Sequence, residues 1–280
     1  MRSTMTELFT GLFDDASHFP PGNAPLPESV ERHRAHRREW YASLVGPLLV
    51  PGGAAQELMD IVGEDADPLR VALIMRPGDD VTELIRSVAA LDGHPVVRVA
   101  AVELGWHPGW QDLDLNGLPM VLEVGRDEAQ YVALNDIRRA RRDGVDVIAK
   151  YRTGPTSRWH WPDEAELAEF LVNAAERSLP FKLTGGLHHL VRGRYGHSPG
   201  AAEEENHGLL NVIIAVAASL GAATHGAVRT MLTDRRGPEL VNAVEQLTPA
   251  QVTAVREALT AYGCCTVTDP IGELRTLGLL

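Results

Sequence analysis

The chain has 280 residues, of which 44% are hydrophobic and 23% charged, and its net charge at pH 7 is −12. A chain of this length can bury a full core without disulfides or a structural metal. The acidic balance argues against a nucleic-acid partner, because phosphate contacts need clustered lysine and arginine. We find no internal repeat and no low-complexity linker, so residues 1–280 are interpreted as a single domain.

Three features indicate a cytoplasmic protein without a membrane partner. The first residues, MRSTMTELFTGLFDD, lack the apolar stretch and cleavage site of a signal peptide. The only cysteines, Cys264 and Cys265, are adjacent, and such neighbours rarely bridge each other, so a reducing compartment is expected. The longest apolar run, residues 208–223, contains Asn211 and Ser219, which favours a buried helix over a membrane span. We expect both cysteines to be buried and unreactive.

Short β-branched runs alternate along the chain with longer stretches of helical periodicity. The predicted strands lie in residues 11–19, 47–53, 69–80, 95–106, 118–128, 145–154, 179–187 and 263–270. The predicted helices lie in residues 27–45, 52–63, 79–91, 127–144 and 162–178, and from residue 207 onward, with extra helices over 225–262.

This alternation predicts a parallel sheet covered by helices, and eight strands fit a closed (β/α)₈ barrel of the TIM type. An open doubly wound sheet is the alternative, but no Gly-x-Gly-x-x-Gly turn follows an early strand. The fourth connection, HPGWQDLDLNG, is too short and too rich in breakers for a full helix.

Polar side chains cluster at the predicted carboxyl ends of the strands, where parallel barrels place their active sites. We predict a catalytic group there, made of two carboxylates and two amines, and a set of substrate-binding residues around it. The catalytic candidates are Glu103, Glu123, Lys150 and Lys182. The substrate-binding candidates are Arg76, Arg152, Thr153, Thr184, Gly185, Gly186, His188 and His189.

The lysines Lys150 and Lys182 end two neighbouring strands in the segments AKYRTG and FKLTGG. Burial lowers the pKa of an amine, and a second cation nearby lowers it further, so that it can attack a carbonyl and form a Schiff base. In the alternative interpretation, the lysines form ion pairs with Glu103 and Glu123 that only hold the barrel together.

These two segments resemble the lysine strands of the deoxyribose-phosphate aldolases and related class I aldolases. The resemblance covers some fifteen residues. It implies that Lys150 forms the Schiff base, that Lys182 tunes its pKa, and that the backbone N–H groups of Gly185 and Gly186 hold a substrate phosphate. Two departures stand out: the aspartate that the family carries on an early strand has no clear counterpart, and Tyr151 and Arg152 replace small residues.

The sequence leaves three functions open. The first is a lysine-dependent lyase or isomerase that acts on a small, possibly phosphorylated, carbonyl compound, with Arg76 and Arg152 holding an anionic group. The second is a metal-assisted enolising enzyme, for which only Glu103 and Glu123 are obvious ligands. The third is a non-catalytic barrel that binds a ligand. His188, His189 and His207 match no zinc signature, so we expect no metal and no cofactor. The sequence does not determine whether the protein forms a homo-oligomer.

Overall fold

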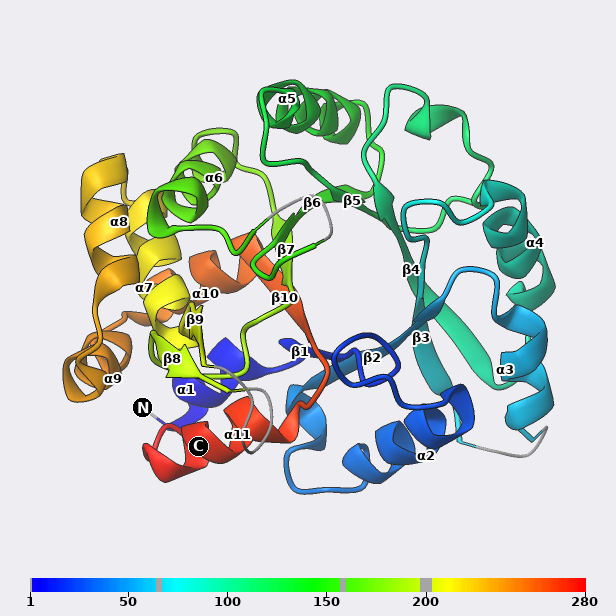
Figure 1. The fold of residues 1–280 in the computed structure, drawn as a ribbon, viewed down its shortest axis with the longest axis horizontal. Helices are drawn as coiled ribbons and strands as arrows, with labels where there is room; N and C mark the ends of the chain where they lie inside the picture. The colour runs from blue at the N-terminus through cyan, green and yellow to red at the C-terminus, as the bar shows by residue number, and fades with distance from the viewer. Residues whose placement is uncertain (1, 64–66, 157–159, 197–202) are drawn as a thin grey trace.

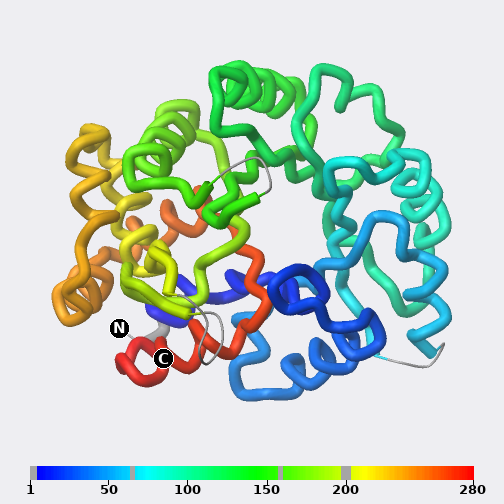
Figure 2. Tube along the Cα trace, viewed as in Figure 1, coloured from blue at the N-terminus to red at the C-terminus, as the bar shows by residue number. Residues whose placement is uncertain are grey.

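The computed structural model describes residues 2–63, 67–156, 160–196 and 203–280 of the chain (Figure 1). Eight parallel strands form a closed barrel, and the chain passes once around it in sequence order (Figure 2). The last strand closes the barrel by pairing with both β1 and β7. The barrel strands are β1 (Phe13–Asp15), β2 (Val45–Pro51), β3 (Leu69–Ile74), β4 (Val97–Gly105), β5 (Met120–Glu123), β6 (Val147–Arg152), β7 (Phe181–Thr184) and β10 (Leu259–Cys264).

Helices cover the outside of the barrel, one after most of the strands (Figure 1). The predicted (β/α)₈ barrel is therefore confirmed, together with additional helices near the C-terminus. The helices are α1 (Arg2–Phe9), α2 (Leu26–His36), α3 (Ala55–Ile61), α4 (Val81–Leu91), α5 (Ala129–Arg142), α6 (Glu164–Glu176), α7 (Leu209–Leu220), α8 (His225–Thr233), α9 (Gly237–Glu245), α10 (Pro249–Ala258) and α11 (Thr268–Thr276).

Shorter elements lie in three of the connections. As expected, no α-helix follows β4, and the connection contains only the 3-10 helix η2 (Trp110–Asp112). A second 3-10 helix, η1 (Ala42–Leu44), precedes β2. No strand was predicted between β7 and α7, but this polar segment contains an antiparallel strand pair, β8 (Gly193–Tyr195) and β9 (Glu204–Asn206).

The eighth strand is the main difference between the predicted and the observed elements. The sequence predicts a strand over residues 263–270, whereas the structure has β10 at Leu259–Cys264 and begins α11 at Thr268. Helix α10 ends at Ala258 and the strand begins at the next residue, so no glycine or proline separates them. The helical periodicity of α10 therefore conceals the start of β10.

Successive side chains on β6 and β7 point alternately toward the helices outside the barrel and into the barrel interior. Tyr151 and Phe181 point outward to helix α6, where Phe170 stacks on the Tyr151 ring at 4.5 Å and meets the Phe181 ring edge-on at 5.2 Å. Lys150 and Lys182, which are next to Tyr151 and Phe181 on these strands, therefore point the opposite way, into the barrel. The strand register also sets these two residues directly opposite each other.

Between β2 and β3, part of the barrel interior is apolar. Leu49, Ala72 and Ile74 form a small buried cluster there that is separate from the main core between barrel and helices. No helix in the described residues combines the length and apolarity needed to cross a bilayer.

Helix α6 begins with a capping box that supports a testable prediction. The Asp163 carboxylate accepts hydrogen bonds from the backbone N–H groups of Ala165 and Glu166, both at 2.8 Å, and the Glu166 side chain accepts from the backbone of Asp163. We expect Asp163→Ala to lower the free energy of unfolding by about 1 kcal/mol, because it removes the cap. Asp163→Asn keeps the accepting oxygen and serves as the matched control. Urea unfolding compares them, and equal losses would contradict this role.

Candidate functional site

A chain of alternating charges crosses the barrel interior. Lys182 Nζ contacts Asp14 Oδ2 at 2.5 Å and also bonds Glu103 Oε1. The other oxygen of Glu103 lies 3.1 Å from Lys150 Nζ, which in turn lies 2.9 Å from Glu123 Oε2. Glu103 thus joins the two ammonium groups. The chain ends at Arg152, whose guanidinium binds both oxygens of Glu123 at 2.8 and 3.1 Å.

The four predicted catalytic residues are therefore brought together, and contacts within the network shift the pKa values of Lys182, Glu123 and Glu103. Burial lowers the pKa of Lys182, but the charges of Asp14 and Glu103 outweigh burial, so the pKa lies above its usual value. Burial raises the pKa of Glu123, but Lys150 and Arg152 outweigh it and bring that pKa to about 2. The pKa of Glu103 is also lowered, because its two lysines outweigh burial.

Asp14 differs from the other two carboxylates. Burial raises its pKa to about 6, although Lys182 opposes the change. Its second oxygen, Oδ1, has no hydrogen-bond partner among the described residues. This oxygen lies against Gly46 so closely that a Cβ there would overlap it. Asp14 is the one carboxyl of the network that can exchange a proton near neutral pH.

A cavity of about 520 Å³ reaches this network from the amino-terminal ends of the strands. Asp14, Glu103 and Lys182 line its deep part, and the exposed Arg70 lies at its rim. The sequence analysis placed the site at the opposite ends of the strands, and Arg152 and Glu123 do lie there, with side chains 34% and 25% exposed. The charge network therefore extends from the cavity to the carboxyl-terminal face.

The Thr/Gly segments after β6 and β7 lie against each other at that face. The Thr153 hydroxyl donates to the carbonyl oxygens of Thr184, at 3.2 Å, and Gly185. Gly185 and Gly186 have φ of +77° and +79°, and a Cβ on Gly186 would collide with the Trp161 ring. These glycines are needed for the turn and the close approach of the two loops, whether or not they bind a phosphate.

Three predicted substrate-binding residues lie in other surroundings. Arg76 is exposed on the loop after β3, where its backbone N–H bonds Asp79. His188 lies beside the cysteines at the end of β10. His189 pairs with Glu273 of α11 at 2.6 Å and stacks on Tyr195.

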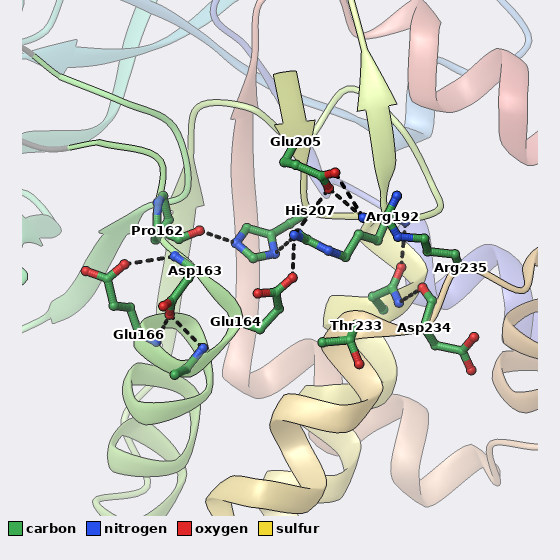
Figure 3. Close-up of polar contacts among 12 residues, drawn as sticks. Pro162, Asp163, Glu164, Glu166, Arg192, Glu205, His207, Thr233, Asp234 and Arg235 are labelled. Atoms are coloured by element: carbon green, nitrogen blue, oxygen red, sulfur yellow. Dashed lines mark hydrogen bonds and ion pairs between the residues drawn. The ribbon is translucent and has the colours of Figure 1, made fainter. Parts of the chain in front are cut away.

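His207 belongs to a separate polar cluster that attaches the β8–β9 hairpin to α6 (Figure 3). Its Nε2–H donates to the carbonyl of Pro162 at 2.9 Å, and Arg192 contacts its Nδ1 at 3.4 Å. Burial lowers the pKa of His207 to about 4, and the charge of Arg192 adds to this effect. Arg192 also pairs with Glu164 and with Glu205, and Arg235 binds both oxygens of Glu205. We assign this cluster a structural role, since ion pairs there join two elements.

The three histidines that were considered for a zinc site, His188, His189 and His207, therefore lie in different places and have different partners. Within the described part of the chain, no group of three or more histidine, cysteine, aspartate or glutamate side chains is arranged to hold a metal ion. The two carboxylates proposed for the metal-assisted alternative, Glu103 and Glu123, bind lysine and arginine instead.

Sequence reasoning missed two features of this site. Asp14 was not among the predicted site residues, because its contact with Lys182 spans 168 positions of sequence. The second feature is a count. Of the 26 lysine and arginine residues in the chain, only Lys150 and Lys182 are lysines. Both lysine ammonium groups thus lie in the barrel interior, where both are bonded to the carboxylate of Glu103.

The class of protein that fold and site define is a (β/α)₈ barrel with a charged interior. Searches of known family models and of curated proteins find no match to the sequence.

The bridging position of Glu103 predicts a large effect of its neutralisation. Glu103→Gln keeps the shape of the side chain, but both lysines lose the carboxylate that they share, and the one facing the amide nitrogen also loses its hydrogen-bond acceptor. We expect the free energy of unfolding to fall by about 3–5 kcal/mol, as when a buried ion pair is broken. Glu123→Gln, at the more exposed end of the network, is the matched control and should cost less. Chemical denaturation measures both, and equal costs would contradict the bridging role.

The raised pKa of Asp14 predicts a pH dependence of stability. The folded-state pKa, about 6, is above the ordinary value of 3.8, so protonated Asp14 favours the native state. That contribution is complete only below about pH 3 and is lost as the pH rises through 6. Relative to Asp14→Asn, the wild type should lose about 3 kcal/mol between pH 3 and pH 7, from the difference between 3.8 and about 6 at 1.36 kcal/mol per pKa unit. Unfolding curves of both proteins across this range provide the measurement, and a constant difference would refute the assignment.

Proposed function

We propose that the chain is a lyase or isomerase that acts on small carbonyl compounds, with its two lysines at the reaction centre. The observation that carries the proposal is where those lysines lie. Arginine makes buried ion pairs with carboxylates at least as well as lysine, and the chain uses arginine at its other 24 basic positions. Only an amine can lose its proton and condense with a carbonyl. The two positions that retain an amine are adjacent in the barrel interior.

The contacts support different roles for the two amines. Lys182 is held between Asp14 and Glu103, which raise its pKa, so it stays an ammonium group that can stabilise a developing oxyanion. Lys150 lies nearer the carboxyl-terminal face, beside the partly exposed Glu123. We assign to Lys150 the attack on the carbonyl carbon, which forms an imine with loss of water.

Proton transfer in this scheme uses the hydrogen-bonded chain between the amines and Asp14. Lys150 must release a proton before it attacks, and Glu103 and Lys182 connect it to Asp14. A carboxyl with a pKa of about 6 takes up and releases protons near neutral pH. Asp14 is thus the acid/base group of the proposal, although it was not among the predicted catalytic residues.

The cavity, which Lys182 lines and Lys150 does not, supports a small anionic substrate on the Lys182 side of the network. Its volume of about 520 Å³ suits a compound of a few carbon atoms, and two arginines, Arg37 and Arg70, line it. Arg37 already donates to the backbone oxygens of Ala42 and Val45, which fixes its guanidinium near the rim. At the carboxyl-terminal face of the barrel, Arg152, which pairs with Glu123, is the cation that would bind an anionic group.

A non-catalytic ligand-binding barrel is the second candidate, and one observation favours it. The three cations Lys150, Lys182 and Arg152 face the three carboxylates of Asp14, Glu103 and Glu123, so the network is neutral and each lysine is paired twice. Such a network can hold the barrel together without reacting.

Borohydride trapping separates the two candidates. We would incubate the protein with pyruvate, acetaldehyde or dihydroxyacetone phosphate, reduce it, and locate adducts by mass spectrometry. With two lysines in the sequence, an adduct can form only on Lys150, Lys182 or the terminal amine. We expect the adduct on Lys150 with at least one probe.

The matched controls keep the positive charge. Lys150→Arg should abolish the internal adduct, whereas Lys182→Arg should leave it on Lys150, formed more slowly. Adducts confined to the terminal amine of the folded protein, with all three probes, would reject the imine mechanism and leave the ligand-binding candidate.

A further inference from the structure

The end of β10 holds a cluster of nucleophilic and titratable side chains that the proposed reaction does not use. Cys264 and Cys265 are the only cysteines of the chain. The Sγ of Cys265 lies 3.3 Å from Nε2 of His188, and Nδ1 of the same ring lies 3.3 Å from Oδ2 of Asp269 at the start of α11. A thiol, an imidazole and a carboxylate are therefore in sequential contact.

The carboxylate end of this arrangement determines the state of the ring. Burial lowers the pKa of His188, but hydrogen bonds with Asp269, Cys264 and Cys265 outweigh it and raise the pKa to about 12. The ring is then an imidazolium at neutral pH, with Nδ1–H donated to Asp269 and Nε2–H directed at Cys265. The positive charge of the ring therefore lies against the Cys265 sulfur, the atom at which a nucleophilic thiol reacts.

The two cysteines have different surroundings although they are adjacent in the sequence. Cys264 is buried, its thiol donates to the carbonyl of Thr266 at 3.3 Å, and burial raises its pKa despite a 3.8 Å contact with Nδ1 of His188. Cys265 is only half-buried. Of the two cysteines expected to be buried, only Cys264 is.

We propose that Cys265 is a nucleophilic thiol that forms thioethers with small electrophiles carrying a carbonyl group conjugated to a carbon–carbon double bond. The thiolate sulfur adds to the β-carbon, the π electrons move to the α-carbon, and that carbon takes the proton from Nε2 of His188. One C–S bond and one C–H bond form, the C=C π bond is lost, and no oxidant or leaving group is needed. Asp269 is the positioning residue, because it fixes the ring and stabilises its charge.

This site is independent of the proposed lysine chemistry, and its test needs no knowledge of the substrate. N-ethylmaleimide is the probe, since it contains the conjugated carbonyl of the proposed class. We would measure the labelling rate of the wild-type protein between pH 5.5 and 8.5 and locate the adduct by mass spectrometry. We expect labelling of Cys265 and not of Cys264, with rates at pH 6 and pH 8 that agree within about threefold.

An ordinary thiol with a pKa of about 8.5 would instead react about 80-fold more slowly at pH 6 than at pH 8. A rate for Cys265 that follows this steep dependence, or no labelling of Cys265, would overturn the proposal. This wild-type measurement decides the question alone, even if a variant fails to fold.

Variants test the part played by the ring. His188→Gln should lower the labelling rate at pH 6 at least tenfold and restore the steep pH dependence, and Asp269→Asn should do so in part. His189→Gln is the matched control, because the neighbouring His189 pairs with Glu273 and not with a cysteine. Equal rates at pH 6 for folded His188→Gln and the wild type would also overturn the proposal.

Discussion

The position of Glu103 between two ammonium groups is the constraint on which the barrel interior depends. An ammonium group removed from water destabilises the fold by several kcal/mol unless carboxylates surround it. Lys150 and Lys182 lie on adjacent strands in register, so their charges would repel without a shared carboxylate. Glu103 supplies one oxygen to each, and Asp14 and Glu123 complete the pairing on either side.

This network also explains why the barrel is not filled in the usual way. The interior of such barrels is normally packed by layers of bulky branched side chains. Here Gly46, Ala72, Ala101 and Ala261 face the interior near the amino-terminal strand ends, and the cavity occupies the volume they leave. A larger residue at 46 would collide with the Asp14 carboxylate. The small residues thus make room for the buried charges, and the space beside them forms a cavity that is open to the outside.

The sequence was sufficient for those parts of the fold and site that depend on local pattern. Period-two alternation places Lys150 and Lys182 inside, because their strand neighbours Tyr151 and Phe181 are large and apolar and pack outward. Local pattern could not place Asp14, since β1 has only three residues and meets β7's lysine only after β10 closes the barrel. The start of β10 was hidden for a similar reason, because the tertiary structure and not a breaker residue ends α10. The contact of His188 with Cys265 joins loops 77 positions apart and left no sequence signal.

The choice of lysine over arginine distinguishes a structural from a chemical reason for the buried charges. If stability alone were involved, the planar guanidinium would satisfy two carboxylates with more hydrogen bonds and could not lose its charge. An amine offers fewer hydrogen bonds but can be deprotonated, which has no benefit for packing. The chain places arginine at the exposed end of the same network, in Arg152, where a permanent charge bound to Glu123 is sufficient. Lysines occur only at the two inner positions, one of which contacts Asp14, and this division follows if at least one inner position must lose a proton during a reaction.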